Sequence, residues 1–142
     1  MMRLVTKNSA ETEEIAYRLA SKLKGDEIIA FYGDLGAGKT TFTRGIAKYF
    51  RTKEDVSSPT YAIAHEYEAE NGKIYHFDMY RINSYEDLES TGFFDYLGKG
   101  IIIIEWSENI EESLPKDTVK IKIAKDMNND EQRVIEIEGI EI

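Results

Sequence analysis

The sequence predicts an α/β fold in which a small parallel sheet is extended by antiparallel strands and helices lie on both faces. Three observations support this prediction. A short apolar run, residues 27–32, leads through a glycine-rich loop into a segment with apolar residues at helical spacing. Four consecutive isoleucines, Ile101–Ile104, are typical of a central strand that is covered on both faces. Two later segments, 118–125 and 132–138, alternate in polarity and predict an antiparallel appendage.

Helix signals place the first two helices. The first is predicted from about Ala10 to Lys24, where Asn8 supplies the N-terminal cap and Gly25 stops the helix. The second helix follows the glycine-rich loop and extends roughly to Phe50, because no proline interrupts its apolar spacing.

Turn signals organise the middle of the chain. Residues 61–70 and 73–80 are predicted as two strands, and Asn71-Gly72 between them is typical of a tight hairpin. Ser84 is predicted to cap a short helix that Gly92 terminates. The isoleucine strand then follows as the next regular element.

Length and composition limit the classes of protein. The 142 residues suffice for one domain, residues 1–142, and leave little for a substrate domain or a long lid. The absence of cysteine excludes a disulfide framework, a zinc–thiolate site and thiol catalysis. No apolar leader and no apolar stretch of membrane-spanning length are present, which predicts a cytoplasmic protein. The net charge of −9 disfavours stable direct binding of nucleic acid and favours a protein partner.

The strongest functional signal is a nine-residue segment that fits the pattern Gly-x4-Gly-Lys-Thr, the phosphate-binding loop of P-loop NTPases. Its residues are Gly33, Asp34, Leu35, Gly36, Ala37, Gly38, Lys39, Thr40 and Thr41. Glycine lets the backbone approach an anion closely, and the following helix directs its free N–H groups there. We expect Lys39 to extend from a solvent-facing loop to the β- and γ-phosphates, and the Thr40 hydroxyl to bind Mg²⁺. The sequence therefore predicts a P-loop NTPase-like domain that binds a nucleoside triphosphate.

Such a site needs an acidic residue at the carboxyl end of a strand, where it holds Mg²⁺ directly or through water. Glu105 directly follows the isoleucine strand, and Asp78 ends the second strand of the hairpin. We predict that both are catalytic and metal-binding residues. The alternative for each is an ordinary strand-terminal acid that faces water, and the sequence does not decide which of the two binds the metal directly.

Two further polar residues have competing interpretations. Thr60 lies one helix after the phosphate-binding loop, where nucleotide switches often carry a threonine that senses Mg²⁺ and the γ-phosphate. Taken alone, the run Ser58-Pro59-Thr60 indicates only a turn. His76 stands between two aromatic residues and is predicted to be a hydrogen-bonded core histidine, not a catalytic base.

Four ordered motifs resemble the TsaE family, also called YjeE, of bacterial P-loop ATPases that are needed to make threonylcarbamoyladenosine on transfer RNA. They are GDLGAGKTTFTRG at 33–45, SPTY at 58–61, HFDMYR at 76–81 and IEWSE at 104–108. Hundreds of families share a P-loop, whereas its combination with the last two motifs is specific. The resemblance covers nearly the whole chain.

The resemblance implies that residues 33–41 bind ATP and Mg²⁺, that Thr60 acts as a switch, and that Asp78 and Glu105 hold the metal or position water. It also implies that the protein docks on the TsaB–TsaD pair and hydrolyses ATP in support of the modification, without performing the transfer itself. Many relatives carry arginine where this chain has Asn109, so no role is assigned to that position.

Two other functions stay open on the sequence. A small metabolite kinase shares the P-loop, but kinases of this size commonly close an arginine-rich lid and the arginines of this chain are not clustered. A nucleotide-gated scaffold without meaningful turnover is the second alternative. The base is not specified by any sequence signature, so ATP follows from the resemblance alone.

Overall fold

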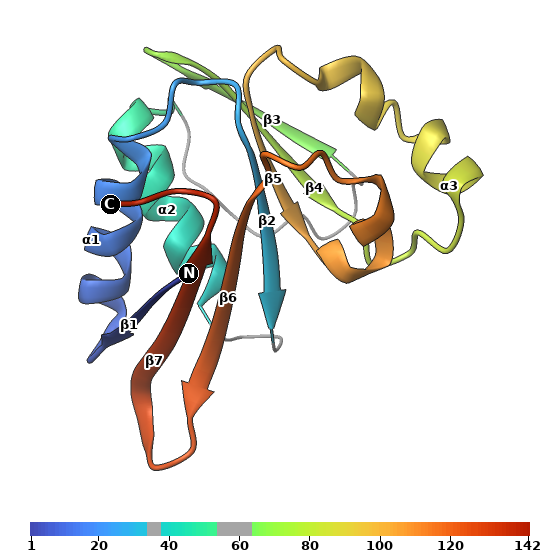
Figure 1. Cartoon of the computed structure of the whole chain (residues 1–142). Helices are drawn as coiled ribbons and strands as arrows, with labels where there is room; N and C mark the ends of the chain where they lie inside the picture. Colours follow the sequence, from blue (N-terminus) through green and yellow to red (C-terminus); the bar gives the residue numbers. More distant parts are fainter. Residues whose placement is uncertain (34–37, 54–63) are drawn as a thin grey trace.

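The structure, a computed structural model, describes residues 1–33, 38–53 and 64–142 (Figure 1). The predictions for Asp34, Leu35, Gly36, Ala37 and Thr60 lie outside these residues. The elements are, in chain order, β1 (Met2–Thr6), α1 (Ser9–Ala20), β2 (Ile28–Gly33), α2 (Lys39–Phe50), β3 (Ala64–Ala69), β4 (Gly72–Asp78), α3 (Tyr85–Ser90), the 3₁₀ helix η1 (Phe93–Tyr96), β5 (Ile101–Glu105), the 3₁₀ helix η2 (Ser107–Ser113), β6 (Val119–Asp126) and β7 (Asn129–Glu138).

The strands form one mixed sheet in the order β1-β7-β6-β2-β5-β4-β3. The four inner strands β6, β2, β5 and β4 run parallel, whereas β1, β7 and β3 pair in the antiparallel sense. The predicted α/β class is therefore confirmed. The isoleucine run is also confirmed as a central strand, because β5 pairs with β2 on one side and β4 on the other.

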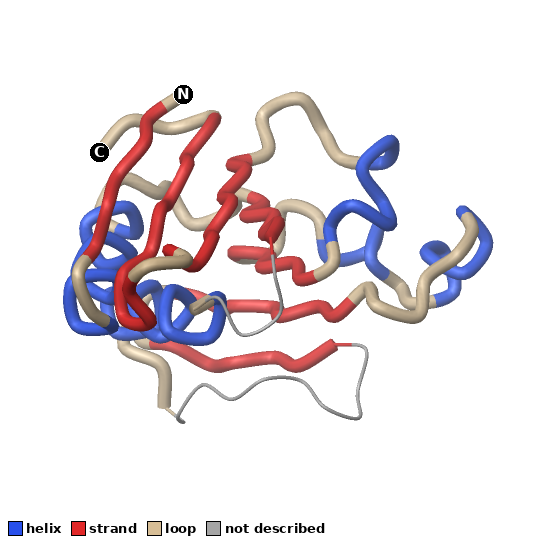
Figure 2. The backbone as a smooth tube through the Cα atoms, turned by 90° about the horizontal axis from the view of Figure 1, so that it is seen from below, coloured by secondary structure: helices blue, strands red, loops and turns tan. Residues whose placement is uncertain are grey.

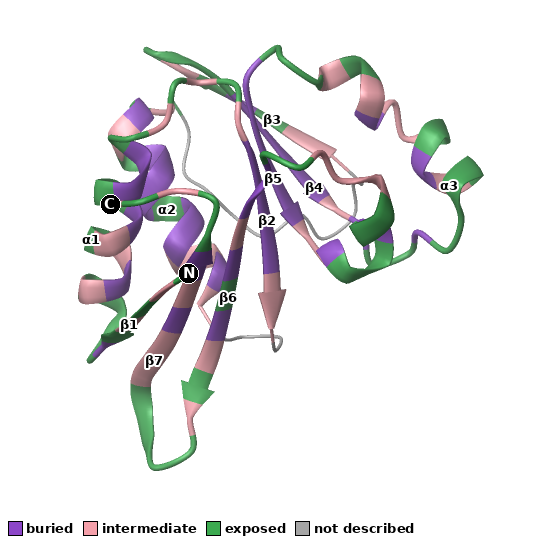
Figure 3. Ribbon diagram, in the orientation of Figure 1, coloured by how far each residue is buried: buried purple, intermediate pink, exposed green. Residues whose placement is uncertain are grey.

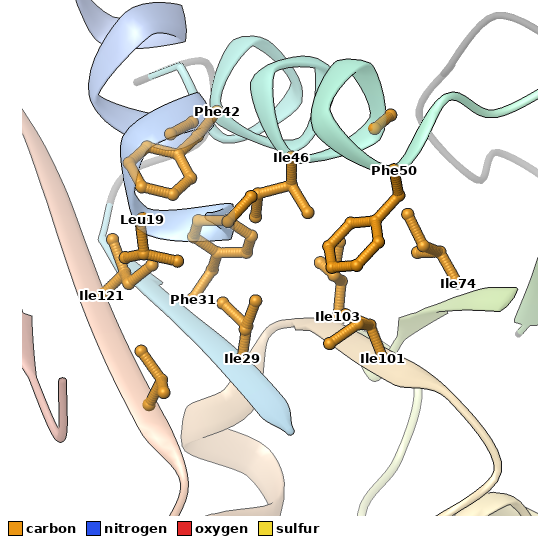
Figure 4. Packing of buried hydrophobic residues seen from close by; sticks show 14 of the residues in the cluster. Leu19, Ile29, Phe31, Phe42, Ile46, Phe50, Ile74, Ile101, Ile103 and Ile121 are labelled. Atoms are coloured by element: carbon orange, nitrogen blue, oxygen red, sulfur yellow. The ribbon is translucent and has the colours of Figure 1, made fainter. Parts of the chain in front are cut away.

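Helices cover both faces of the sheet, as Figure 2 shows from below. On one face α1 and α2 pack over Ile101 and Ile103 of β5 (Figure 4). Phe31 of β2, Phe42 of α2 and other apolar side chains complete this layer. On the other face α3, η1 and η2 cover Ile102 and Ile104. Burial of each such side chain contributes about 1.5–3 kcal/mol, so the alternation along β5 stabilises both layers. The buried residues follow the inner strands in Figure 3.

Gly45 explains how closely α1 and α2 pack. A Cβ at this position would lie 2.3 Å from the carbonyl oxygen of Glu13 and 2.6 Å from the Cβ of Ala16. Only glycine permits this distance between the two helices. The contact fixes the axis of α2, whose first turn is part of the predicted site.

Both predicted caps are confirmed. Asn8 Oδ1 accepts a hydrogen bond from the Glu11 N–H at 2.9 Å, and Ser84 Oγ accepts one from Asp87 N–H at 3.1 Å. The predicted end of the first helix is wrong, because α1 ends at Ala20 and the chain turns before it reaches Gly25.

The strands differ from the prediction in three respects. β1 was not predicted, since its five residues are stabilised as a strand only by pairing with β7, far away in the sequence. The last two strands pair in the antiparallel sense as predicted, but β6 also pairs in parallel with β2 and so belongs to the parallel part of the sheet. The β3–β4 hairpin turns at Glu70-Asn71, and Gly72 is already the first residue of β4.

No helix in the described part of the chain is long and apolar enough to cross a membrane.

Candidate functional site

The end of β2 and the start of α2 meet at the carboxyl edge of the parallel strands, on either side of residues 34–37. Gly33, the last residue of β2, has φ 114°, and a Cβ there would lie 2.3 Å from the carbonyl oxygen of Ile123. Gly38, the N-cap of α2, has φ 111° and provides no side-chain cap. The first N–H groups of α2 are therefore left for another acceptor, as anion binding at a helix start requires.

Lys39 is the first residue of α2 and is only 6% exposed, so the prediction of a solvent-facing lysine is wrong. Its Nζ lies 5.7 Å from the centroid of the Trp106 ring, at cation–π distance. No acidic side chain among the described residues forms an ion pair with it. A largely buried lysine at the start of a helix favours an anion beside it, because the ammonium group and the helix start both carry positive charge.

Asp78 and Glu105 end the neighbouring parallel strands β4 and β5 and are directly paired in register. Since alternate residues of a strand share a face, Glu105 lies on the same face as Ile101 and Ile103, under α2. The sequence placed both carboxylates at strand ends, and the structure brings them together.

The surroundings of the two carboxylates differ. Asp78 Oδ1 accepts a hydrogen bond from the Tyr80 N–H at 3.0 Å. The Glu105 side chain is 14% exposed, and its Oε2 lies 2.9 Å from Nε2 of His76. Asp78 is thus held by its own turn, whereas Glu105 contacts a side chain of the next strand.

Trp106 has an unusual backbone conformation, with φ 60° and ψ 43°. This left-handed conformation costs a non-glycine residue about 1–2 kcal/mol and reverses the chain immediately after Glu105. The indole packs against the Tyr80 ring, with 4.9 Å between centroids. Trp106 therefore belongs to the site through its contacts with Lys39 and Tyr80.

Metal binding by these residues alone is not expected. Within the described part of the chain, no group of three or more acidic or histidine side chains is arranged to hold a metal ion. Thr40, the second residue of α2, and the two carboxylates supply oxygen ligands, the type that Mg²⁺ prefers. Because Mg²⁺ in nucleotide sites keeps several water and phosphate ligands, this donor set fits the ion as part of a nucleotide complex.

A hollow of about 170 Å³ adjoins the start of α2. It is formed where the beginnings of α1, α2 and β7 converge, and its lining includes Ser9, Thr12, Thr41 and Arg133. No sequence pattern connects the start of α1 with the start of α2, because their proximity depends on how the two helices pack.

A larger hollow of about 670 Å³ lies on the face of β6 that points away from α1 and α2. Within it, Tyr32 donates a hydrogen bond to Glu111, which also binds Lys120 Nζ at 2.5 Å. Hydrogen bonds from Lys120 and Tyr32 lower the pKa of Glu111, and burial raises the pKa of Tyr32. Four glutamates against two lysines line this hollow, which makes it unsuitable for a polyphosphate.

Known proteins resemble the chain over most of its length. Residues 6–135 match the family described as threonylcarbamoyl adenosine biosynthesis protein TsaE. The tRNA threonylcarbamoyladenosine biosynthesis protein TsaE of Rickettsia felis is 39% identical over 121 residues, which cover 84% of this chain and 71% of that protein. The Bacillus subtilis protein of the same name is 38% identical over 130 residues, 91% and 80% of the two chains.

The fold agrees with these similarities. The crystal structure of Bacillus subtilis YdiB superposes with a TM-score of 0.72 at 33% identity and covers 94% of this chain and 82% of its own. The resemblance predicted from the four motifs is confirmed, and the chain belongs to the TsaE family of threonylcarbamoyl adenosine biosynthesis proteins.

Proposed function

We propose that this protein is a Mg²⁺-dependent ATPase that supports the threonylcarbamoyladenosine modification of transfer RNA by docking on a TsaB–TsaD complex. Residues 33–41 bind the phosphates through backbone N–H groups and Lys39. Thr40, Asp78 and Glu105 hold Mg²⁺ or orient the attacking water, and Thr60 senses the γ-phosphate. Bound Mg²⁺ supplies neutralisation of the phosphate charge. We expect the protein to act in the cytoplasm, since its relatives are bacterial proteins named for transfer-RNA modification.

The observation that carries this proposal is the position of Lys39, a lysine that is only 6% exposed. It lies at the uncapped start of α2 with no acidic partner among the described residues. The helix start and the lysine both favour negative charge at the same place. The adjoining hollow that contains Ser9 and Thr41 offers a place for the nucleoside next to the phosphates.

The proposed partner dependence has a separate basis. The net charge of −9 makes a transfer RNA backbone a poor direct ligand, so a protein complex is the better target. Arg133 lines the hollow beside the start of α2 and already donates to the carbonyls of Asp130 and Gln132. A charge-stabilising group supplied in trans accelerates phosphoryl transfer by about 10³-fold or more in other P-loop proteins. We therefore propose slow hydrolysis by the isolated protein and faster hydrolysis in the complex.

The test combines binding and turnover. Calorimetry with ATP, with and without Mg²⁺, measures the affinity of the isolated protein, and phosphate release is then followed with TsaB and TsaD homologues absent or present. A pull-down of TsaB and TsaD with and without ATP reports docking. Fast hydrolysis at the same rate with and without the TsaB and TsaD homologues would contradict the partner-dependent function. Stoichiometric phosphate transfer to a metabolite would instead support a kinase, and ATP binding without turnover in any mixture would support a scaffold.

A further inference from the structure

His76 is fully buried on β4, yet its imidazole has no ordinary hydrogen bond in the described part of the chain. Its exposed fraction is 0%, and neither Nδ1 nor Nε2 has a hydrogen-bond partner among the described residues. Each buried polar atom left in this way costs about 1–3 kcal/mol. The prediction of a hydrogen-bonded core histidine is thus only half right, because the residue is in the core without the hydrogen bond.

The neighbours of His76 show that packing does not require an imidazole there. His76 is paired in register with Ile103 of β5, and Ile74 precedes it on the same face of β4. Both neighbours are aliphatic and fully buried in the layer beneath α2. An aliphatic side chain at position 76 would fit this layer and avoid the cost of unpaired nitrogens, so stability alone does not account for histidine.

The group that His76 does approach is the carboxylate of Glu105. Nε2 and Oε2 lie 2.9 Å apart, although the N–H direction does not yet point at the oxygen. Rotation of the Glu105 carboxylate about its terminal bond moves Oε2 relative to the N–H bond at low energetic cost, because this torsion is soft. Among the described residues, no other donor lies at hydrogen-bond distance from this carboxylate, whereas Asp78 already accepts from Tyr80 N–H.

We propose that His76 is a positioning residue whose Nε2–H donates a hydrogen bond to Glu105 and fixes its carboxylate toward the start of α2. This role rests on the ATP hydrolysis proposed above. A long, flexible glutamate side chain has several rotamers, and a buried donor on the adjacent strand selects one of them. Loss of a hydrogen-bond partner that orients a metal-binding carboxylate or histidine typically lowers metal affinity or activity by about 10- to 100-fold.

The first test separates binding from turnover in four variants. His76→Leu removes the donor and keeps the volume, and it is expected to lower single-turnover hydrolysis in the partner complex by about 10-fold or more while the ATP dissociation constant stays at the wild-type value. His76→Gln returns an N–H near the position of Nε2 and is expected to restore most of the rate. In a Glu105→Ala background, His76→Leu should cause no further loss, because both residues act through one carboxylate.

Wild-type hydrolysis by His76→Leu would overturn the proposal, as would equal losses with and without Glu105. A purely structural role would show instead as a lower melting temperature of His76→Leu, whereas removal of unpaired buried nitrogens predicts an unchanged or higher one. If His76→Leu does not fold, the comparison of His76→Gln with Glu105→Ala carries the same test.

The second test needs no activity, so it distinguishes failure of this inference from failure of the proposed ATPase function. The chain has only two histidines, and His65→Gln assigns their ring signals in ¹H–¹⁵N spectra of the ligand-free protein. We expect a slowly exchanging Nε2 proton on His76 whose chemical shift changes in Glu105→Ala. The hydrogen bond would be rejected, even if the protein hydrolyses ATP, in either of two cases. One is that Nε2 carries no proton, and the other is that its chemical shift is the same in wild type and Glu105→Ala. Absence of hydrolysis in the wild type with an intact ring signal would reject only the ATPase function.

Discussion

The side-chain amide of Asn109 donates a hydrogen bond to the backbone carbonyl of Met79 at 2.8 Å and also lies 3.4 Å from the carbonyl of Tyr80. This contact joins η2, which follows β5, to the turn that follows β4. Met79 in turn donates its N–H to the carbonyl of Glu105 at 3.0 Å. The segments that carry Asp78 and Glu105 are therefore tied together just beyond the two carboxylates.

Asn109→Ala should loosen this connection. Loss of one side-chain hydrogen bond is expected to lower the unfolding free energy by about 1 kcal/mol, as measured by urea denaturation. We also expect slower ATP hydrolysis with little change in ATP affinity, because the roles proposed for the two carboxylates are expressed mainly in the transition state. Glu112→Ala, at an exposed position of the same 3₁₀ helix, is the matched control. An Asn109→Ala protein with wild-type stability and rate would show that the contact has no such role.

Lys39→Met should separate the stability of the ligand-free protein from nucleotide binding. The methionine keeps the apolar stem of this largely buried residue, and the lost ammonium group has no ion pair among the described residues, so the melting temperature without nucleotide should stay close to the wild-type value. ATP affinity should weaken by at least ~10-fold, about 1.4 kcal/mol. Lys48→Met removes a lysine from the same helix whose side chain is 69% exposed, and it should leave ATP affinity unchanged. Unchanged affinity in Lys39→Met would exclude the phosphate-binding assignment.

The carboxyl group of Glu111 should make stability depend on pH. Hydrogen bonds from Lys120 and Tyr32 lower its pKa in the folded protein below the reference value of 4.5. A group with a lowered folded pKa stabilises the protein fully above its unfolded pKa, and this contribution is lost as the pH falls through the folded pKa. Glu111→Gln should therefore reduce the unfolding free energy at pH 7, and its difference from wild type should shrink below about pH 4. Urea denaturation at both pH values tests this, and an equal difference at both would contradict it.

Elements with strong local signals could be predicted from the sequence. The isoleucine strand, the helix after the glycine-rich loop and the caps Asn8 and Ser84 each depend on residues within a few positions of one another. The placement of Asp78 and Glu105 at strand ends could be predicted for the same reason. Their identity as catalytic or metal-binding residues stays a prediction.

Features that depend on contacts distant in the sequence could not be predicted. β1 exists as an edge strand because Met2–Thr6 pairs with residues 133–137. Lys39 Nζ lies 5.7 Å from the Trp106 ring because the chain reverses at Trp106, which no pattern around Lys39 indicates. The approach of His76 to Glu105 requires the register between β4 and β5, and a one-residue shift would place the two side chains on opposite faces.

Glu105→Ala and Asp78→Ala should separate chemistry from binding, which substitution of Lys39 cannot do. Both carboxylates lie at the edge of the sheet from which the phosphate-binding loop begins, and Lys39 with the start of α2 remains intact in each variant. ATP should still bind, whereas single-turnover hydrolysis with TsaB and TsaD homologues should fall by ~10²-fold or more, as for other groups that act on a transition state.

We expect Glu105→Ala to be the more damaging of the two. Asp78 Oδ1 already accepts a hydrogen bond from the Tyr80 N–H of its own turn. Glu105 extends from a strand whose isoleucines are 0–1% exposed, and its carboxylate is not held by such a turn in the described part of the chain. Glu108→Ala, three residues later and exposed, is the control for a nearby loss of charge. The decisive measurement is ATP affinity beside the single-turnover rate for all three variants. If Glu105→Ala hydrolyses ATP at the wild-type rate, Glu105 is only a strand-terminal acid, and metal binding and water positioning must then depend on Asp78.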